Sequence, residues 1–137
     1  MKKELIKSAQ IVLAPREFAA PVIMRRLVLE KPSCGEIALS AYGFFILYVN
    51  GRRVGEDYFI PSASLYRRRE FKSLAYPISD EFTYRLYYNT YEISEYLTDG
   101  DNTIEIALGD GWFRQTERVA EGDMSFGNAL GTIYAVR

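Results

Sequence analysis

The segment 108–114, with the sequence Leu-Gly-Asp-Gly-Trp-Phe-Arg, combines the residue types that recognise a sugar. Its two glycines let the backbone approach a ligand closely, and Trp112 offers a flat face on which a sugar ring stacks. Asp110 and Arg114 supply hydrogen-bonding groups for hydroxyls. The same pattern is also typical of a strand that ends in a bulge or turn, with Trp112 packed at the edge of the fold. Both interpretations stay open from the residues alone.

Carboxylates are the remaining candidates for catalysis, because none of the 137 residues is a histidine. The absence of histidine excludes Ser-His-Asp and Cys-His nucleophile systems and any zinc site that uses histidine. A glycosidase needs only two carboxylates. However, the pairs Asp110 with Asp123 and Glu92 with Glu95 show no spacing that separates them from ordinary surface acids. The sequence predicts no catalytic residue and no complete active site.

Two further polar clusters have competing interpretations. Tyr66 precedes the basic run Arg67-Arg68-Arg69, whose guanidinium groups suit a carboxylate or phosphate but equally suit a solvated or interface face. The segment 99–102, Asp-Gly-Asp-Asn, offers oxygen ligands that calcium prefers, together with Asp110. It lacks the spacing of an EF-hand, and Asp and Asn are common turn formers. We therefore expect no cofactor and no bound metal, and structural calcium has no specific motif to support it.

Composition limits the partners and the compartment. The 17 basic and 18 acidic residues give a net charge of −1, so we expect neither nucleic acid nor a membrane as a partner. The single cysteine, Cys34, excludes an internal disulfide and is expected to be a buried or half-buried thiol. After the basic start Met1-Lys2-Lys3, Glu4 and Lys7 interrupt any apolar signal core, so a cytoplasmic location is expected.

The elements that must position these residues are short strands. Apolar runs bounded by Gly, Pro, Asn or Asp predict strands over 10–13, 22–30, 36–41, 44–49, 84–91, 102–108 and 131–136. Runs 36–41 and 102–108 alternate and should bury one face, whereas 44–49 does not alternate and should be buried on both. A tight hairpin turn is expected at Asn50-Gly51. Ser94 is expected to cap a single helical turn. Without crossover helices, these signals predict an all-β antiparallel two-sheet sandwich of the jelly-roll type.

Several motifs, in order along the chain, resemble the N-terminal domain of bacterial α-L-rhamnosidases, glycoside hydrolase family 78. Residues 43–55, Gly-Phe-Phe-Ile-Leu-Tyr-Val-Asn-Gly-Arg-Arg-Val-Gly, are similar to its Gly-x-Tyr-Glu-Leu-Tyr-Ile-Asn-Gly-Lys-Arg-Val-Gly signature. Further family motifs are resembled by four more segments: Pro61 with Tyr66-Arg67-Arg68-Arg69, the run 91–97, Gly100-x-Asn102 and the run 108–113. The resemblance implies one galactose-binding-like domain over 1–137, with leading strands in 1–34 and the family-like core in 35–137.

The chain departs from the family pattern at three places. Residues 61–65, Pro-Ser-Ala-Ser-Leu, lack the tryptophan of the family's Pro-Gly-Trp loop, which weakens an aromatic sugar contact there. Residues 70–83 form an apparent insertion. Gly127-Asn128 stands where a Gly-Asp-Arg is expected, so an ion pair is absent from the pattern.

The resemblance implies a parent enzyme that hydrolyses terminal α-L-rhamnosides with inversion, using two acids on a separate (α/α) barrel. That catalytic barrel is the implied partner, and this chain, without it, is not expected to be active alone. The implied roles are bracing of the barrel and recognition of a rhamnose-containing glycan. The ligand-binding candidates are Trp112, Asn50, Asp110, Arg114 and Tyr66.

Three other functions stay open. An independent carbohydrate-binding module would present aromatic and polar groups in an exposed groove. A small stand-alone glycoside hydrolase would carry a carboxylate pair on the sandwich and would turn over a chromogenic rhamnoside by itself. A protein-assembly role would use the Arg67 to Arg69 face and would weaken as salt screens its charges.

Overall fold

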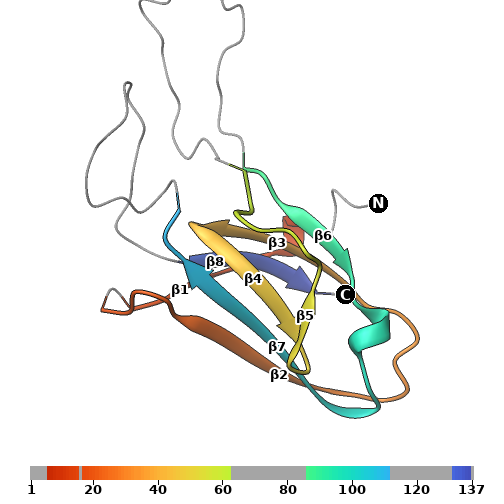
Figure 1. The fold of residues 1–137 in the computed structure, drawn as a ribbon. Coiled ribbons are helices and arrows are strands. Elements are labelled where there is room, and N and C mark those ends of the chain that lie inside the picture. The colour runs from red at the N-terminus through yellow and green to blue at the C-terminus, as the bar shows by residue number, and fades with distance from the viewer. Residues whose placement is uncertain (1–5, 16, 63–85, 112–130, 137) are drawn as a thin grey trace, which may run out of the picture.

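The computed structural model describes residues 6–15, 17–62, 86–111 and 131–136. Within these ranges the chain forms eight strands in two four-stranded antiparallel sheets (Figure 1). One sheet has the order β1-β8-β3-β6 and the other the order β2-β7-β4-β5. The elements are η1 Ile6–Ser8, β1 Gln10–Leu13, β2 Val22–Leu29, β3 Glu36–Tyr42, β4 Phe44–Val49, β5 Arg52–Val54, β6 Asn89–Glu92, η2 Ser94–Tyr96, β7 Gly100–Gly109 and β8 Gly131–Val136.

The strand order is that of a jelly roll. Strand β4 pairs with β5, β3 with β6, β2 with β7 and β1 with β8, and every one of these pairs is antiparallel. Nested pairs of this kind arise when one long hairpin is wound so that its strands divide between two sheets. The predicted all-β antiparallel sandwich is confirmed.

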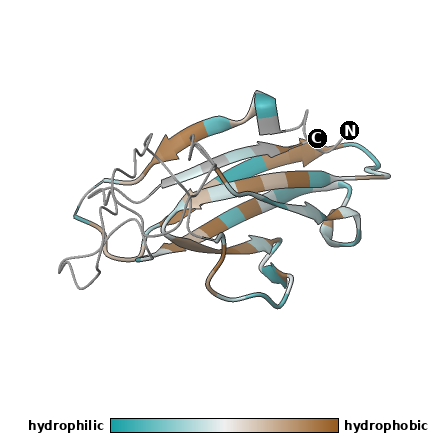
Figure 2. Ribbon diagram, turned by 90° about the horizontal axis from the view of Figure 1, so that it is seen from above, coloured by the Kyte–Doolittle hydropathy of each residue, from teal (hydrophilic) through white to brown (hydrophobic). Residues whose placement is uncertain are grey.

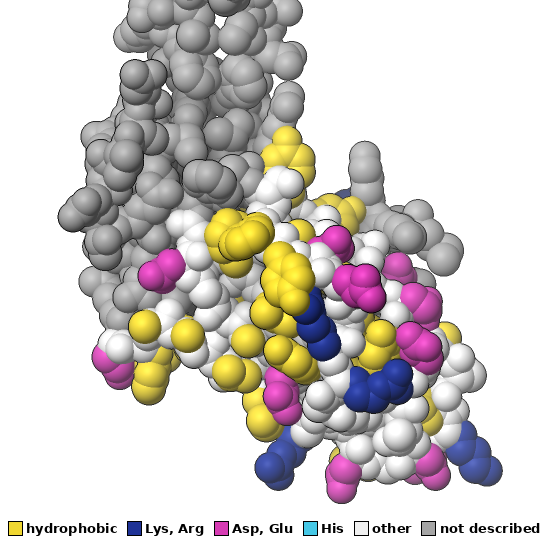
Figure 3. All heavy atoms as spheres, viewed as in Figure 1, with side chains coloured by type: hydrophobic (Ala, Val, Ile, Leu, Met, Phe, Trp, Pro, Cys, Tyr) yellow, Lys and Arg dark blue, Asp and Glu magenta, His cyan; other side chains and the backbone are white. Residues whose placement is uncertain are grey.

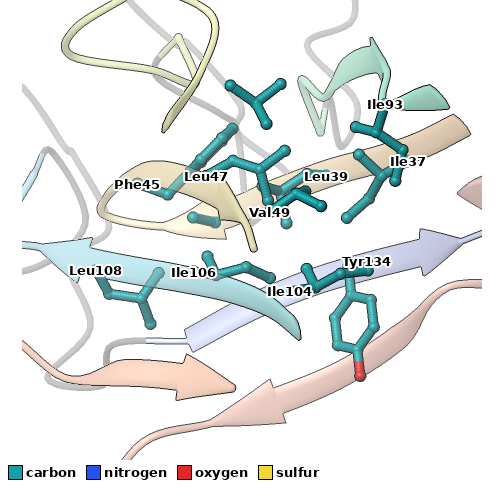
Figure 4. Packing of buried hydrophobic residues seen from close by; sticks show 12 residues of the cluster. Ile37, Leu39, Phe45, Leu47, Val49, Ile93, Ile104, Ile106, Leu108 and Tyr134 are labelled. Atoms are coloured by element: carbon teal, nitrogen blue, oxygen red, sulfur yellow. The ribbon is translucent and has the colours of Figure 1, made fainter. Parts of the chain in front are cut away.

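The hydrophobic core lies between the two sheets (Figure 4). Every second residue of each facing strand points into it, and Figure 2 shows the resulting alternation of hydrophobic and hydrophilic residues along the strands. The largest fully buried aliphatic and aromatic side chains are Ile37, Leu39, Phe45, Leu47, Val49, Ile93, Ile104 and Ile106. The predicted inward faces of 36–41 and 102–108 are confirmed. The expectation that 36–41 buries only one face is wrong, because the side chains on its other face are buried too.

The strand that is buried on both faces is β3, not β4, so the prediction for 44–49 is wrong. In β4 the side chains alternate between half-buried and buried positions. In β3 both Ala38 and Ser40 are fully buried on the outer side, where Tyr88 packs against Ala38 and Ser40 donates a hydrogen bond to the carbonyl of Tyr87. Burial of an outer face depends on which distant segment covers it, and local alternation does not report that.

The Asn50-Gly51 turn is confirmed and is followed by a strand that was not predicted. Asn50 and Gly51 have φ angles of 52° and 73°, as a tight hairpin between β4 and β5 requires. Strand β5 has only three residues, two of them arginines, so it carries no apolar pattern of its own. Pairing with β4 makes it a strand.

Two local predictions near β6 need correction. The strand predicted over 84–91 begins only at Asn89, and residues 86–88 are not in a strand. Ser94 does not cap η2: the turn has Ile93 at its N-cap and no side-chain cap. The hydroxyl of Ser94 instead accepts a hydrogen bond from the backbone N–H of Gly35 at 2.9 Å, which ties the turn to the start of β3.

Outside the sheets, Cys34 is exposed, so the expectation of a buried or half-buried thiol is wrong. It lies in the connection between β2 and β3, which the core does not cover. In the part of the chain that the structure describes, no helix is long and apolar enough to cross a membrane. The apparent insertion 70–83 and Gly127-Asn128 lie outside the described residues.

Candidate functional site

A groove of about 220 Å³ lies on the outer face of the β2-β7-β4-β5 sheet. Its floor follows from strand pairing, because Phe44 lies opposite Gly109 and Ile46 lies opposite Ala107 across β4 and β7. Gly109 has no side chain and Ala107 has a small one, so the surface is hollow there. The lining residues are Phe44, Phe45, Ile46, Tyr58, Phe59, Ala107, Leu108, Gly109 and Asp110.

Two exposed aromatic residues form the wall of the groove. Tyr58 and Phe59, in the loop after β5, are 63% and 77% exposed. The loop is anchored to β4 because the N–H of Phe45 donates to the carbonyl of Ile60 at 3.0 Å. The ring of Phe59 meets that of Phe44 edge to face, with centroids 5.5 Å apart. The backbone hydrogen bond and the ring contact therefore hold this loop in place with both aromatics exposed on the surface.

Arg53 of β5 contacts the ring of Tyr58 and fixes its position. Its guanidinium carbon lies 4.1 Å from the ring centroid, and its Nη1 donates to the Tyr58 hydroxyl at 2.7 Å. Its Nη2 donates to the carbonyl of Asp57 at 2.8 Å. Its Nε is buried and has no hydrogen-bond partner among the described residues. The cation–π contact and the two hydrogen bonds fix the position of Tyr58.

Tyr91 of β6 connects this loop to the core. Its ring packs beside Gly55 and meets Phe45 edge to face at 6.3 Å. The pKa of the Tyr91 hydroxyl is raised to about 12, mainly by burial and also by the negative charge of Asp57, while the positive charge of Arg53 opposes the increase. The Tyr91 hydroxyl therefore stays neutral to a higher pH than an ordinary tyrosine, and Tyr91 acts as a packing residue in this arrangement.

Asp110 stands directly after β7 at the edge of the groove. Among the described residues it is the only charged one in the lining, and the others are apolar, aromatic or glycine. The groove can accept an apolar or aromatic surface and can offer one carboxylate as a hydrogen-bond acceptor. It does not present the carboxylate pair that glycoside hydrolysis commonly uses.

The structure does not bring Asn50 and Asp110 together. Asn50 binds the start of β7, where its Oδ1 accepts a hydrogen bond from the N–H of Thr103 at 2.8 Å. Asp110 follows the other end of the same strand, and a strand rise of about 3.3 Å per residue places it about 23 Å from Thr103. Trp112, Arg114 and Tyr66 lie outside the described residues, as does the basic run 67–69. Ligand binding by these five residues stays a prediction.

Two of the residues that gave rise to the calcium interpretation, Asp99 and Asn102, have structural partners. Asn102 is buried and hydrogen-bonded to Thr98 and to the carbonyl of Gly100. Asp99 accepts a hydrogen bond from the N–H of Lys31 at 2.8 Å. Over the described ranges there is no group of three acidic, cysteine or histidine side chains that could hold a metal ion. Their use in loop structure supports the turn interpretation.

Sequence reasoning missed Arg53, Tyr58 and Phe59. The available signal was the aromatic pair Tyr58-Phe59 placed between the turn glycine Gly55 and Pro61, in a segment with no apolar alternation. Aromatic residues in such a loop are either folded back into the core or displayed. Only the tertiary structure shows that these two are displayed.

Comparison with protein families identifies one family over most of the chain. The model of the α-L-rhamnosidase N-terminal domain matches residues 31–137. A curated α-L-rhamnosidase from Formosa agariphila is 26% identical over 99 residues, which is 72% of this chain but 9% of that protein.

Solved structures give the same fold. The α-L-rhamnosidase from Aspergillus terreus aligns with a TM-score of 0.66 at 18% identity, over 96% of this chain and 14% of that one. The α-L-rhamnosidase from Streptomyces avermitilis, in complex with L-rhamnose, aligns with a TM-score of 0.65 at 21% identity, over 86% of this chain and 10% of that one. The chain thus spans a small part of the proteins it resembles.

Proposed function

The chain belongs to the α-L-rhamnosidase N-terminal domain family, and from this membership we propose that it serves as an accessory domain of an enzyme that hydrolyses terminal α-L-rhamnosides. The observation that carries the proposal is the family match over residues 31–137, in a chain that spans 9% of its curated relative. In relatives of that size most of the polypeptide lies beyond this domain. The proposed partner is the catalytic domain of the same polypeptide.

The geometry supports a bracing role ahead of a catalytic one. Glycoside hydrolysis commonly needs an acid and a second carboxylate on opposite sides of the scissile bond. Of the lining residues that the structure describes, Asp110 is the single carboxylate, and the floor and walls are apolar. We therefore assign bond cleavage to the catalytic domain, while the jelly roll supplies a rigid surface against which that domain packs.

The test compares three proteins with a chromogenic α-L-rhamnoside: the 137-residue chain, the full polypeptide, and the full polypeptide without residues 1–137. We expect no turnover by the chain alone and turnover by the full polypeptide. Deletion should lower both the activity and the midpoint of thermal unfolding of the catalytic part. Turnover by the 137-residue chain would instead identify it as a small stand-alone hydrolase. A deletion variant with unchanged activity and an unchanged midpoint of thermal unfolding would exclude bracing.

Carbohydrate recognition is the second candidate, and one observation favours it. Asp110 lies at the edge of a groove walled by two exposed aromatics, and Trp112 follows two residues later in the chain. An aromatic face next to a carboxylate suits a sugar ring and its hydroxyls. Since the Streptomyces avermitilis relative is in complex with L-rhamnose, this sugar is the ligand to test.

Trp112 is the only tryptophan of the chain, so its fluorescence reports on this segment. A saturable change on titration with L-rhamnose, lost in Asp110→Asn and Tyr58→Ala, would support recognition. D-glucose is the control sugar, and the titration is repeated with and without calcium. An unchanged emission would leave bracing as the sole role proposed.

A further inference from the structure

The outer face of the β2-β7-β4-β5 sheet carries a continuous apolar surface, here called the outer-face patch. Ala107 of β7 pairs with Val22 of β2 on one side and with Ile46 of β4 on the other, so the three side chains form one row. Tyr58 and Phe59 stand beside this row and close the groove. Figure 3 shows hydrophobic side chains gathered over this face. Contiguous exposed apolar patches mark interaction sites more often than chance exposure does.

Phe59 has a backbone conformation that is unfavourable for a bulky residue. Its φ angle is 58°, in the left-handed region where a bulky side chain is rarely found. Its ring is 77% exposed, and its ring contact within the described residues is the edge of Phe44. Because the ring is mostly exposed, its packing within this domain contributes little stability to offset the backbone strain. Such outliers persist where the surrounding structure fixes them, commonly at binding sites.

Fixed aromatic residues within an apolar patch are typical anchors of protein interfaces. The Tyr58 ring is held by Arg53 and the Phe59 ring by Phe44, so binding would cost little side-chain entropy. A sugar is a poorer match to the patch itself, because a saccharide needs several polar groups and the groove lining provides one charged residue.

We propose that the outer-face patch is the docking surface for another domain of the same polypeptide, with one large apolar side chain of that domain seated in the groove between Phe59 and Gly109. This inference rests on the proposed function as an accessory domain. The length of the relatives indicates what covers the patch. The aligned region is only 9% of the Formosa agariphila protein and 14% of the Aspergillus terreus chain, so most of each protein lies outside it. A domain covalently joined to this one is present at high effective concentration, so a patch of modest area suffices.

Hydroxyl-radical footprinting of the full polypeptide, compared with the 137-residue chain, tests the docking surface without using turnover. We expect oxidation of Tyr58 and Phe59 to fall several-fold in the full polypeptide. Tyr87, which lies before β6 in the other sheet, is the internal control and should change little. Equal oxidation of Tyr58 and Phe59 in both proteins would overturn the inference, even if the full polypeptide hydrolyses rhamnosides.

The variant Phe59→Asn separates docking from folding. Asparagine tolerates a positive φ, so the isolated chain should keep or slightly raise its urea midpoint. In the full polypeptide the same variant should raise oxidation of Tyr58 several-fold towards its value in the isolated chain. Ile11→Thr, at an exposed position on β1 of the other sheet, is the matched control and should leave Tyr58 protected.

Two other occupants give different results and would each overturn the inference. If a second copy covers the patch, the isolated chain should sediment as a dimer, and oxidation of Tyr58 should fall as its concentration rises. If a sugar covers it, L-rhamnose should protect Tyr58 in the isolated chain. Protection that appears only in the full polypeptide, and that Phe59→Asn removes, supports docking of a second domain.

Discussion

Asn50 and Asn102 bind each other through their side chains, with the Asn50 Nδ2 donating to the Asn102 Oδ1 at 2.8 Å. Asn50 also donates to the carbonyl of Tyr96 at 2.9 Å and accepts from the N–H of Thr103. Asn102, only 1% exposed, closes the loop before β7 through Thr98 and Gly100. The pair joins the β4–β5 turn to the η2–β7 loop, which gives both asparagines a structural role.

Asn50→Ala and Asn50→Gly together separate the hydrogen bonds of Asn50 from its backbone conformation. Both variants lose the side-chain bonds, which we expect to lower the free energy of unfolding by about 2 kcal/mol. Alanine should lose about 1 kcal/mol more, because glycine accepts the φ of 52° without strain and alanine does not. Urea unfolding measures both values. Equal losses of unfolding free energy in the two variants would show that the positive φ imposes no strain on alanine. Wild-type stability in both variants would show that the side-chain hydrogen bonds of Asn50 do not contribute to the free energy of unfolding.

The two glycines of the Leu-Gly-Asp-Gly motif are predicted to respond differently to alanine. A Cβ at Gly111 would lie 2.9 Å from the Cα and C atoms of Gly43, a backbone that cannot move aside cheaply. A Cβ at Gly109 would meet no atom within 4 Å. We expect Gly111→Ala to destabilise the chain by about 1–3 kcal/mol and Gly109→Ala to have little effect. Thermal unfolding of the two variants measures this, and equal midpoints would contradict it.

Tyr91 makes the stability sensitive to alkaline pH. Its pKa is raised from 10.0 to about 12 in the folded chain, so the unfolded chain loses the Tyr91 proton at a lower pH. The contribution is fully present below pH 10.0 and is lost as the pH rises towards 12. Tyr91→Phe should remove this part of the decline. The measurement is the urea midpoint of both proteins between pH 8 and pH 11.5, and parallel curves would contradict the prediction.

Leu47 tests the core between the sheets. It is 1% exposed and lies in β4 opposite Val54 and Ile106. Leu47→Ala leaves a cavity and should lower the free energy of unfolding by about 2–5 kcal/mol. Val28→Ala, at a position 76% exposed on β2, is the control and should change it by less than about 0.5 kcal/mol. A similar loss in both variants would show that the core is not packed as described.

The groove could be predicted only in part. The sequence singled out Asp110 and the flanking glycines, because Gly and Asp after an apolar run have a local meaning. It could not show that Asn50 lies at the far end of β7 or that Tyr58 and Phe59 form the wall. Those facts depend on how β4, β5 and β7 pair, and pairing joins residues that are distant in the chain.

By itself the sequence determined the strand character of the chain, the inward faces of 36–41 and 102–108 and the Asn50-Gly51 turn. These features follow from steric preferences and alternation between near neighbours, which a single chain displays without its fold. The order of its motifs also indicated the family. Only the tertiary structure decided that β3 is covered on both faces, that Cys34 is exposed, that Asn102 is buried and that Phe59 is displayed. Exposure depends on which distant segment packs over a residue, and short-range patterns carry no record of that segment.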